Sequence, residues 1–352
     1  MSGDYKRIEN FLRQDKFDGF TKDDLFIKNF IPKAWGQDIA ALSNMAEALR
    51  NTKNDNVFRG RSHALRNEKI FLIDRVVQFA LHPKVNPWKK EIAKVTDFNH
   101  YGYYLEHLNI ILGCYQDVAG DKYLGLNTRV TEYLRDESLA QQNAHARLIP
   151  HVKMRWAADQ AAIIYSLWLY DRNNGTEYHI EPKNRWIEYM ETHGKHQETG
   201  MYITEVMGVK DYSNQPRGCS HAYMCYYLEH FDTVHGQEQW ELFKKHMMVD
   251  GFFLSGFREY LPGYKGKWTP DSGPIIFGIG VAATGLALKP MKVWGEYWQD
   301  RMCAVKRTVE WGMILCSMLS WIPLIGRFAS IGDDLLANSI ILAAETTHQK
   351  YI

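Results

Sequence analysis

The sequence has no excess of charge of either sign. Its 352 residues contain 42 Lys and Arg against 41 Asp and Glu, which leaves a formal net charge of +1. A surface that binds nucleic acid brings a basic excess, and a solvating tail brings an acidic one. We therefore expect no nucleic-acid partner and an ordinary globular surface.

The sequence contains few cysteines, and their spacing indicates no disulfide framework. The five cysteines, at positions 114, 219, 225, 303 and 316, form no C-x-x-C pair. An odd number without tight spacing indicates free thiols in a reducing compartment, so we expect a cytoplasmic protein. The Cys219-x-His221-x3-Cys225 run matches no defensible zinc spacing. No Gly-rich phosphate loop follows a strand either, so no metal and no cofactor are expected.

Long hydrophobic runs are also missing. Residues 273–288 and 311–326 are the most apolar stretches, and each is shorter than the roughly 20 residues of a membrane span. The second stretch contains Pro323. The amino terminus lacks the positive-then-apolar order of a secretory signal. These features predict buried core helices and no membrane span.

Strand signals and Pro/Gly-rich linkers are few, and apolar helical segments alternate with short turns instead. Apolar helices are expected at 101–116, 156–170, 219–231 and 274–288. Each is followed by a more polar helix: near 127–140, through Trp186, at 237–247 and at 294–307, the last after Lys289-Pro290. The first helices begin near residues 102, 156, 218 and 273, a repeat of about 54–62 residues.

This repeat predicts an all-α fold, an α/α toroid of about six helical hairpins, or (α/α)6 barrel. Segments 60–82 and 308–347 would supply further helices. An α-solenoid is the competing architecture, but its repeats are shorter. We expect residues 1–60 to form a lead-in packed on the toroid and residues 61–352 to form the toroid domain.

In such a ring, one end of the inner helices faces a central cavity, and polar residues gather at the starts of three of them. We expect catalytic roles for Asp159, Glu259 and Asp271, because a carboxyl in an enclosed cavity can act as an acid while one held by Arg stays ionised. The expected substrate-binding residues are Trp156, Arg217, Cys219, His221, Arg258, Tyr260 and Ser272.

Each of these residues also has a structural interpretation. Asp and Ser cap helix amino termini, so Asp159, Asp271 and Ser272 could be caps. Adjacent Arg258 and Glu259 could form an ion pair that holds their loop. A nucleophilic Cys–His pair is disfavoured, because residues two positions apart on a helix point apart.

Four runs in this order resemble a known group of proteins: Trp156-Ala-Ala-Asp159, Pro216-Arg217-Gly218, Arg258-Glu259-Tyr260 and Asp271-Ser272-Gly273-Pro274. They resemble poorly characterised bacterial α/α-toroid proteins that are similar to the linalool dehydratase/isomerase-like superfamily. The resemblance covers about residues 150–290 and implies an (α/α)6 barrel with a central pocket. The family's catalytic cysteines have no matching motif here and are not carried over.

The leading functional expectation is an enzyme with carboxylate acid–base chemistry, a lyase, hydratase or isomerase acting on a small hydroxylated or isoprenoid-like substrate. A carbohydrate-active enzyme (glycoside hydrolase, lyase or epimerase) is the second, with Trp156, Tyr260 and Trp268 as stacking platforms. A non-catalytic binding or scaffold toroid is the third. All three predict a small-molecule ligand or a scaffold, and a homo-oligomer is compatible with each.

Overall fold

The computed structural model describes residues 3–21, 24–25, 36–52, 62–206, 215–251, 255–264, 266, 269, 271–273, 275–295, 305, 308 and 334–348. The α-helices are α1 (Gly3–Leu12), α3 (Gln37–Asn51), α4 (Ser62–Leu81), α5 (Gly102–Ala119), α6 (Leu124–Leu139), α7 (Ala157–Asn174), α8 (Ile180–His193), α9 (Gly218–Phe231), α10 (Thr233–Met247), α11 (Val281–Trp294) and α13 (Leu335–Thr346), with a 3-10 turn at Ile92–Lys94. The strands are β1 (Arg155–Trp156), β2 (Glu205–Val206), β3 (Met248–Asp250), β4 (Ser255–Phe257), β5 (Ile275–Ile276) and β6 (Ile279–Gly280).

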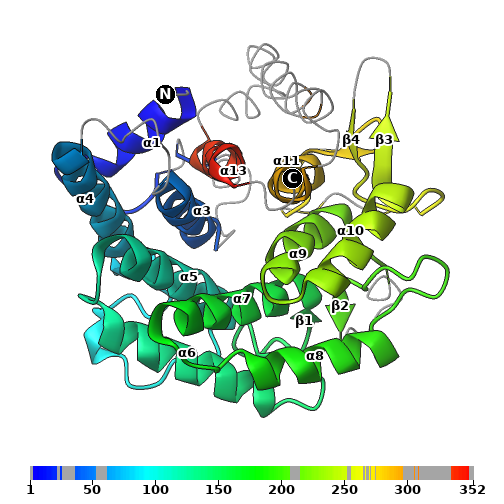
Figure 1. Ribbon diagram of the computed structural model, residues 1–352, viewed down its shortest axis with the longest axis horizontal. Coiled ribbons are helices and arrows are strands. Elements are labelled where there is room, and N and C mark those ends of the chain that lie inside the picture. The colour runs from blue at the N-terminus through cyan, green and yellow to red at the C-terminus, as the bar shows by residue number, and fades with distance from the viewer. Residues whose placement is uncertain are drawn as a thin grey trace.

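Six helices form a closed inner ring. Helix α3 packs against α5, α5 against α7, α7 against α9, α9 against α11, and α11 against α13, which returns to α3 (Figure 1). Helices α4, α6 and α10 lie outside the ring against α5, α7 and α9, while α1 covers α13 and α4. The fold is therefore all-α and an α/α toroid, as the repeat predicted.

Burial explains which helix of a pair lies inside. In α7, 14 of the 18 residues are buried, so this helix is covered on nearly all sides. In α8, 3 of 14 are buried, and they are spaced four apart at Pro182, Trp186 and Met190. A stripe at that spacing covers one face of a helix and leaves the rest in water. In the first three sequence repeats, the apolar first helix and the polar second helix thus become the inner and outer layers.

Segments near the two ends of the chain lie side by side in the ring. Helix α3 comes from the segment expected to be a lead-in, yet it lies between α13 and α5 as one of the inner helices. The Leu335 amide donates to the Asp24 carbonyl, 2.9 Å away. The division at residue 60 stays a prediction, but residues 37–51 are an integral part of the ring.

The prediction of a helix at 274–288 is wrong for the first residues of this segment. Residues 275–280 form an antiparallel hairpin, β5 with β6, whose two turn residues Phe277 and Gly278 have φ of 51° and 83°. Helix α11 begins only at Val281 and continues through Pro290. An apolar run does not distinguish strand from helix, and two left-handed residues in succession make a hairpin turn. Most of the segments expected at 294–307 and 311–326 lie outside the described residues.

A polar network crosses the middle of the ring. The Lys289 ammonium on α11 lies 2.6 Å from Glu47 Oε2 and 3.0 Å from Asn44 Oδ1, both on α3. The Tyr226 hydroxyl on α9 donates to Glu47 Oε1, 3.1 Å away. Lys289 is 2% exposed and Glu47 is 0% exposed. A buried charge needs a partner, so this pair ties three inner helices together across the ring.

Candidate functional site

A cavity of about 350 Å³ opens among the amino-terminal ends of the inner helices. All six inner helices contribute side chains from their first two turns, which requires the six to run in the same direction. The polar lining residues are Gln37, Asn44, Tyr103, His107, Asp159, Thr204, Arg217, Ser220, Tyr223 and Asp271. Leu286, Leu336 and Ile340 form an apolar wall. Ligand pockets typically occupy about 300–1,000 Å³, so the cavity is large enough for one small molecule.

Asp159 lies in the first turn of α7 and is 9% exposed. Burial raises its pKa to about 7, and the charge of Asp271 contributes to the rise. The buried Glu106 carboxyl on α5 lies close enough for the charge of Asp159 to act on it, and neither of its oxygens has a hydrogen-bond partner among the described residues. Burial, and then the charge of Asp159, raise the pKa of Glu106 well above its usual value. Two neighbouring carboxyls with raised pKa values can hold and release a proton near neutral pH.

Asp271 is an exposed residue on the cavity wall. It sits in a tight turn that Ser272 holds: the Ser272 hydroxyl donates to the Thr269 carbonyl, 2.9 Å away, and accepts from the Thr269 amide at 3.1 Å. Ser272 itself is 0% exposed and does not line the cavity. Its contribution is therefore to the shape of the turn that presents Asp271.

Arg217 is held rigidly beside the cavity. Its guanidinium forms an ion pair with Glu259 at 3.0 Å and donates to Thr269 Oγ1 at 2.6 Å. The Glu259 carboxylate also accepts from the Cys219 amide at 3.1 Å and from the Cys219 thiol at 3.1 Å. The Tyr260 ring lies under the guanidinium, 5.7 Å from its carbon. One ion-paired network thus joins the segment around Arg217 to the segments that carry Glu259 and Asp271.

Gly218 allows this network to form. Its amide donates to the Glu259 carbonyl, 2.9 Å away, at the start of α9. A Cβ atom at this position would lie 1.9 Å from the Arg258 carbonyl oxygen. The close approach of two backbone segments, rather than an unusual φ, therefore requires glycine here.

The structure divides the expected site residues into two groups. Those that line the cavity are Trp156, Asp159, Arg217, Cys219 and Asp271. Those that do not are His221, Arg258, Glu259, Tyr260 and Ser272. Glu259 is 0% exposed and pairs with Arg217, not with the neighbouring Arg258. His221 points away, with Nε2 3.2 Å from the Gln239 carbonyl. Trp268 lies outside the described residues.

Cys219 has the properties of a structural thiol. It is 6% exposed, and burial, followed by the charge of Glu259, raises its pKa well above the usual value. A reactive cysteine needs the opposite shift, toward thiolate. Cys114 and Cys225 are likewise buried free thiols. Within the described ranges, no group of three or more potential ligands could hold a metal ion.

Sequence reasoning missed the contribution of α5. Tyr103, Glu106 and His107 lie at positions i, i+3 and i+4, on one face of the first two turns. Tyr103 and His107 line the cavity, and the charge of Asp159 acts on Glu106. The sequence does carry a signal for these residues, namely polar side chains at the start of an inner helix. The signal is weak because most of segment 101–116 is apolar.

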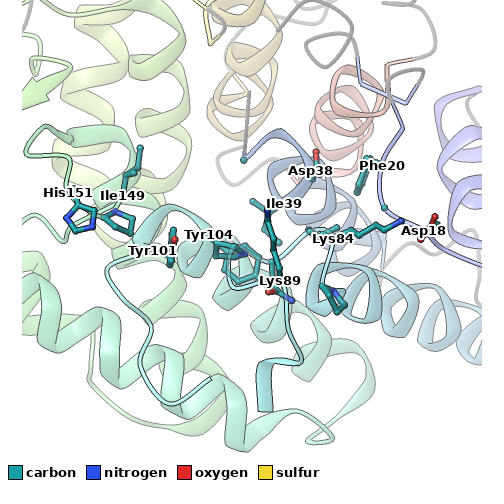
Figure 2. Close-up of a pocket in the computed structure, with 17 residues that line it drawn as sticks. Asp18, Phe20, Asp38, Ile39, Lys84, Lys89, Tyr101, Tyr104, Ile149 and His151 are labelled. Atoms are coloured by element: carbon teal, nitrogen blue, oxygen red, sulfur yellow. Dashed lines mark hydrogen bonds and ion pairs between the residues drawn. The ribbon is translucent and has the colours of Figure 1, made fainter. Parts of the chain in front are cut away.

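A larger hollow of about 1010 Å³ lies outside the ring, between residues 18–20, the loop at 83–89 and residues 149–151 (Figure 2). Several of its polar groups are already engaged: Lys84 pairs with Asp18, and the Tyr104 hydroxyl donates to the Ala80 carbonyl at 2.8 Å. Ile149 lines both this hollow and the central cavity. The central cavity is the better candidate site, because two carboxyl groups line it and burial raises the pKa of one of them, Asp159.

Among the described residues, no helix combines the length and the apolar character needed to cross a membrane. No protein-family model matches the sequence, and no curated protein matches it.

Solved structures do resemble the chain. A family 76 glycoside hydrolase from a bovine Bacteroides thetaiotaomicron strain aligns with a TM-score of 0.51 and 10% identity, over 88% of this chain and 68% of that one. The Lin0763 protein from Listeria innocua aligns with a TM-score of 0.55 and 12% identity over 100% of both chains. A second family 76 enzyme, the mannosidase Bt3792 from Bacteroides thetaiotaomicron VPI-5482, gives 0.47 and 13%, over 88% and 86%.

At identities this low, the structural similarities show only that the toroid fold is shared. The chemistry has to be inferred from the residues of the site. The toroid that the resemblance to the linalool dehydratase/isomerase-like superfamily implied is confirmed. These similarities give no support to a closer relationship with that superfamily.

Proposed function

We propose that the protein is a carbohydrate-active enzyme, a glycoside hydrolase whose catalytic carboxyl groups are Asp159 and Asp271. The observation that carries the proposal is their meeting at one cavity, Asp159 from the first turn of α7 and Asp271 from a turn before β5, with the pKa of Asp159 raised to about 7. Glycoside hydrolysis needs such a pair, one protonated and one ionised. The toroid shared with a family 76 glycoside hydrolase adds support.

The environments suit the two carboxyls to different tasks. Asp159 is buried and keeps its proton near neutral pH, so it can protonate the oxygen of the leaving group. Asp271 is exposed on the cavity wall, where it can attack the sugar or activate a water molecule. Arg217 orients the turn that carries Asp271 through its bond to Thr269.

The cavity wall also suits a sugar. The Trp156, Tyr103 and Tyr223 rings line the cavity, and aromatic faces pack against the C–H faces of sugar rings. Their neighbours are amide, hydroxyl and carboxyl groups. We do not retain the lyase, hydratase or isomerase of an isoprenoid as the leading hypothesis, because the hydroxyl, amide and carboxyl groups beside these rings can bind the hydroxyl groups of a sugar, which a hydrocarbon lacks.

The proposal is tested with a panel of aryl glycosides and the variants Asp159→Asn, Asp271→Asn and Asp136→Asn. Asp136 is an exposed residue on the outer helix α6 and serves as the control. We expect loss of about 10²–10⁴-fold in kcat for the first two variants and none for the third. The loss in Asp159→Asn should shrink with an activated 4-nitrophenyl leaving group, which needs no proton.

The wild-type activity should decline as the pH rises through about 7, where Asp159 loses its proton. Small terpenols form a second arm of the screen. Turnover of a terpenol with no glycosidase activity would refute the proposal and restore the isoprenoid hypothesis. Equal activity of Asp159→Asn and Asp136→Asn would refute the assignment of the acid.

A further inference from the structure

His107 is a buried polar residue without a partner. Its imidazole is 1% exposed, and neither ring nitrogen has a hydrogen-bond partner in the part of the chain that the structure describes. The nearest carboxyl oxygen, Glu106 Oε1, lies 3.7 Å from Nε2, beyond hydrogen-bond distance. Buried polar groups in folded proteins are almost always paired, so an unpaired one needs an explanation. His107 lines the central cavity, where a ligand could supply the partner.

The surroundings keep this imidazole neutral. Burial, and then the charge of Lys289 on α11, lower the pKa of His107 to about 3. The other titratable groups facing it are Tyr103 and Glu106 on its own helix and Tyr223 on α9. A neutral imidazole has one N–H donor and one acceptor nitrogen, which is the pattern that a hydroxyl group matches.

Asn44, on the neighbouring helix α3, presents a second polar group to the cavity. Its Oδ1 accepts from Lys289, and its Nδ2 donates to the Ala40 carbonyl at 2.9 Å. Lysine can only donate, so the orientation of the amide is fixed. One of the two N–H groups on Nδ2 is used by Ala40, which leaves the second to face a ligand.

Charged ligands are disfavoured at this position. Arg217 is the one Lys or Arg among the described lining residues, and Glu259 already neutralises it. An anionic group would therefore find no free cation. A cationic group beside His107 would meet the charge of Lys289, which lowers the pKa of the imidazole although Glu47 pairs with the lysine. Hydroxyl groups are left as the ligand chemistry that fits.

We propose that His107 and Asn44 form a subsite for the hydroxyl groups of an uncharged sugar. Both residues lie in the second turn of their helices, one turn deeper than Asp159, so the subsite is the floor of the cavity. This inference rests on the proposed function, because it assumes that the ligand is a carbohydrate. It adds that neutral sugars are preferred over uronic acids and amino sugars.

The test compares His107→Phe with His145→Phe. His145 is also 1% exposed, but both of its nitrogens are used: Nδ1 with the Asn143 carbonyl at 2.5 Å and Nε2 with Trp186 Nε1 at 3.0 Å. His107→Phe removes no hydrogen bond within the protein, so its urea midpoint should equal or exceed that of the wild type. His145→Phe should lower the midpoint.

The two variants should differ in the opposite way in their affinity for sugars: His107→Phe should lose affinity and His145→Phe should keep it. Calorimetry with methyl glycosides, glucuronate and glucosamine should show the neutral glycosides binding best. His107→Phe should weaken their binding about tenfold, the effect of two ordinary hydrogen bonds. His107→Gln, which keeps one donor and one acceptor, should recover part of the loss. His145→Phe should bind like the wild type.

The outcomes separate the two proposals. If the wild type hydrolyses glycosides but His107→Phe keeps full affinity, or loses stability as His145→Phe does, the subsite is refuted and the proposed function stands. Preference for glucuronate or glucosamine also refutes the subsite. If the wild type binds and hydrolyses no sugar, the proposed function and the subsite both fall.

Discussion

Replacing Asp159 by Asn should make the protein more stable while it removes the proposed acid. The pKa of Asp159 is about 7 in the folded protein, against 3.8 as the usual value for the unfolded chain. Between these two values the folded state holds a proton that the unfolded state has released. The free energy of unfolding of the wild type therefore falls as pH rises, by about 1.4 kcal/mol per pH unit.

Over the whole interval the contribution is about 4 kcal/mol. It is fully present below pH 3.8 and lost by the time the pH has passed 7. Asn has no proton to lose, so the variant avoids this cost. Near pH 4 the two proteins should be equally stable, and above pH 7 the variant should be more stable by up to about 4 kcal/mol.

Urea unfolding at pH 5, 6, 7 and 8 measures the difference, which should grow with pH and level off above 7. Asp171→Asn provides the matched control at the other end of the same helix. Burial opposes ionisation of Asp171, but hydrogen bonds from His179 and Thr176 outweigh it and hold its pKa below the usual value. This contribution to stability is present above the unfolded pKa and lost in acid, so Asp171→Asn should be destabilised at every pH tested.

A variant Asp159→Asn that is less stable than the wild type at pH 8 would refute the reasoning. So would a difference that does not change with pH. Either result would mean that the Asp159 carboxylate is stabilised in the folded protein, and it could then not serve as an acid near neutral pH.

Three other substitutions test the fold around the site by urea unfolding. Phe277→Asn should stabilise the protein by roughly 0.5–1 kcal/mol, because the Phe277 side chain is 88% exposed and its φ of 51° suits Asn. A loss of stability would show that the Phe277 side chain packs against the protein. Lys289→Met should lower the free energy of unfolding by about 3–5 kcal/mol, because it leaves Glu47 unpaired. Adding Glu47→Gln should recover much of this loss. If it does not, the loss of the ion pair is not the cause of the destabilisation. Gly218→Ala should cost about 1–3 kcal/mol or more, and an unchanged midpoint would contradict the close backbone approach.

The ring could be predicted because the same pair of helices, one inner and one outer, recurs along the sequence. The inner helices are mostly apolar and the outer helices are apolar on one face, so the sequence alternates with a period of about 54–62 residues. The hairpin at 275–280 could not be predicted from this alternation. Ile275, Ile276 and Ile279 continue the apolar run into α11, and the turn depends on a left-handed Phe277 that no residue preference announces.

The site was predictable to the extent that it follows from helix direction. Asp159 and Arg217 stand at helix starts and line the cavity. Asp271 also lines the cavity, but from a turn before β5 rather than from the start of α11. Glu259 follows β4 and its partner lies 42 residues away, so its ion pair with Arg217 could not be read from local spacing. His107 lies one turn deeper, where a polar residue on an apolar helix looks like an ordinary core histidine.

The two aspartates of α7 show why local rules fail at this site. The helix dipole favours negative charge at Asp159, in the first turn, and disfavours it at Asp171, in the last full turn. The pKa shifts have the opposite signs: raised at Asp159 and lowered at Asp171. The dipole contributes about 0.3–1 kcal/mol, less than burial without full pairing costs at Asp159. The dipole still acts after proton transfer, when it stabilises the new carboxylate at a helix amino terminus. Asp159 is thus protonated because it is buried, and able to give up its proton because of where its helix begins.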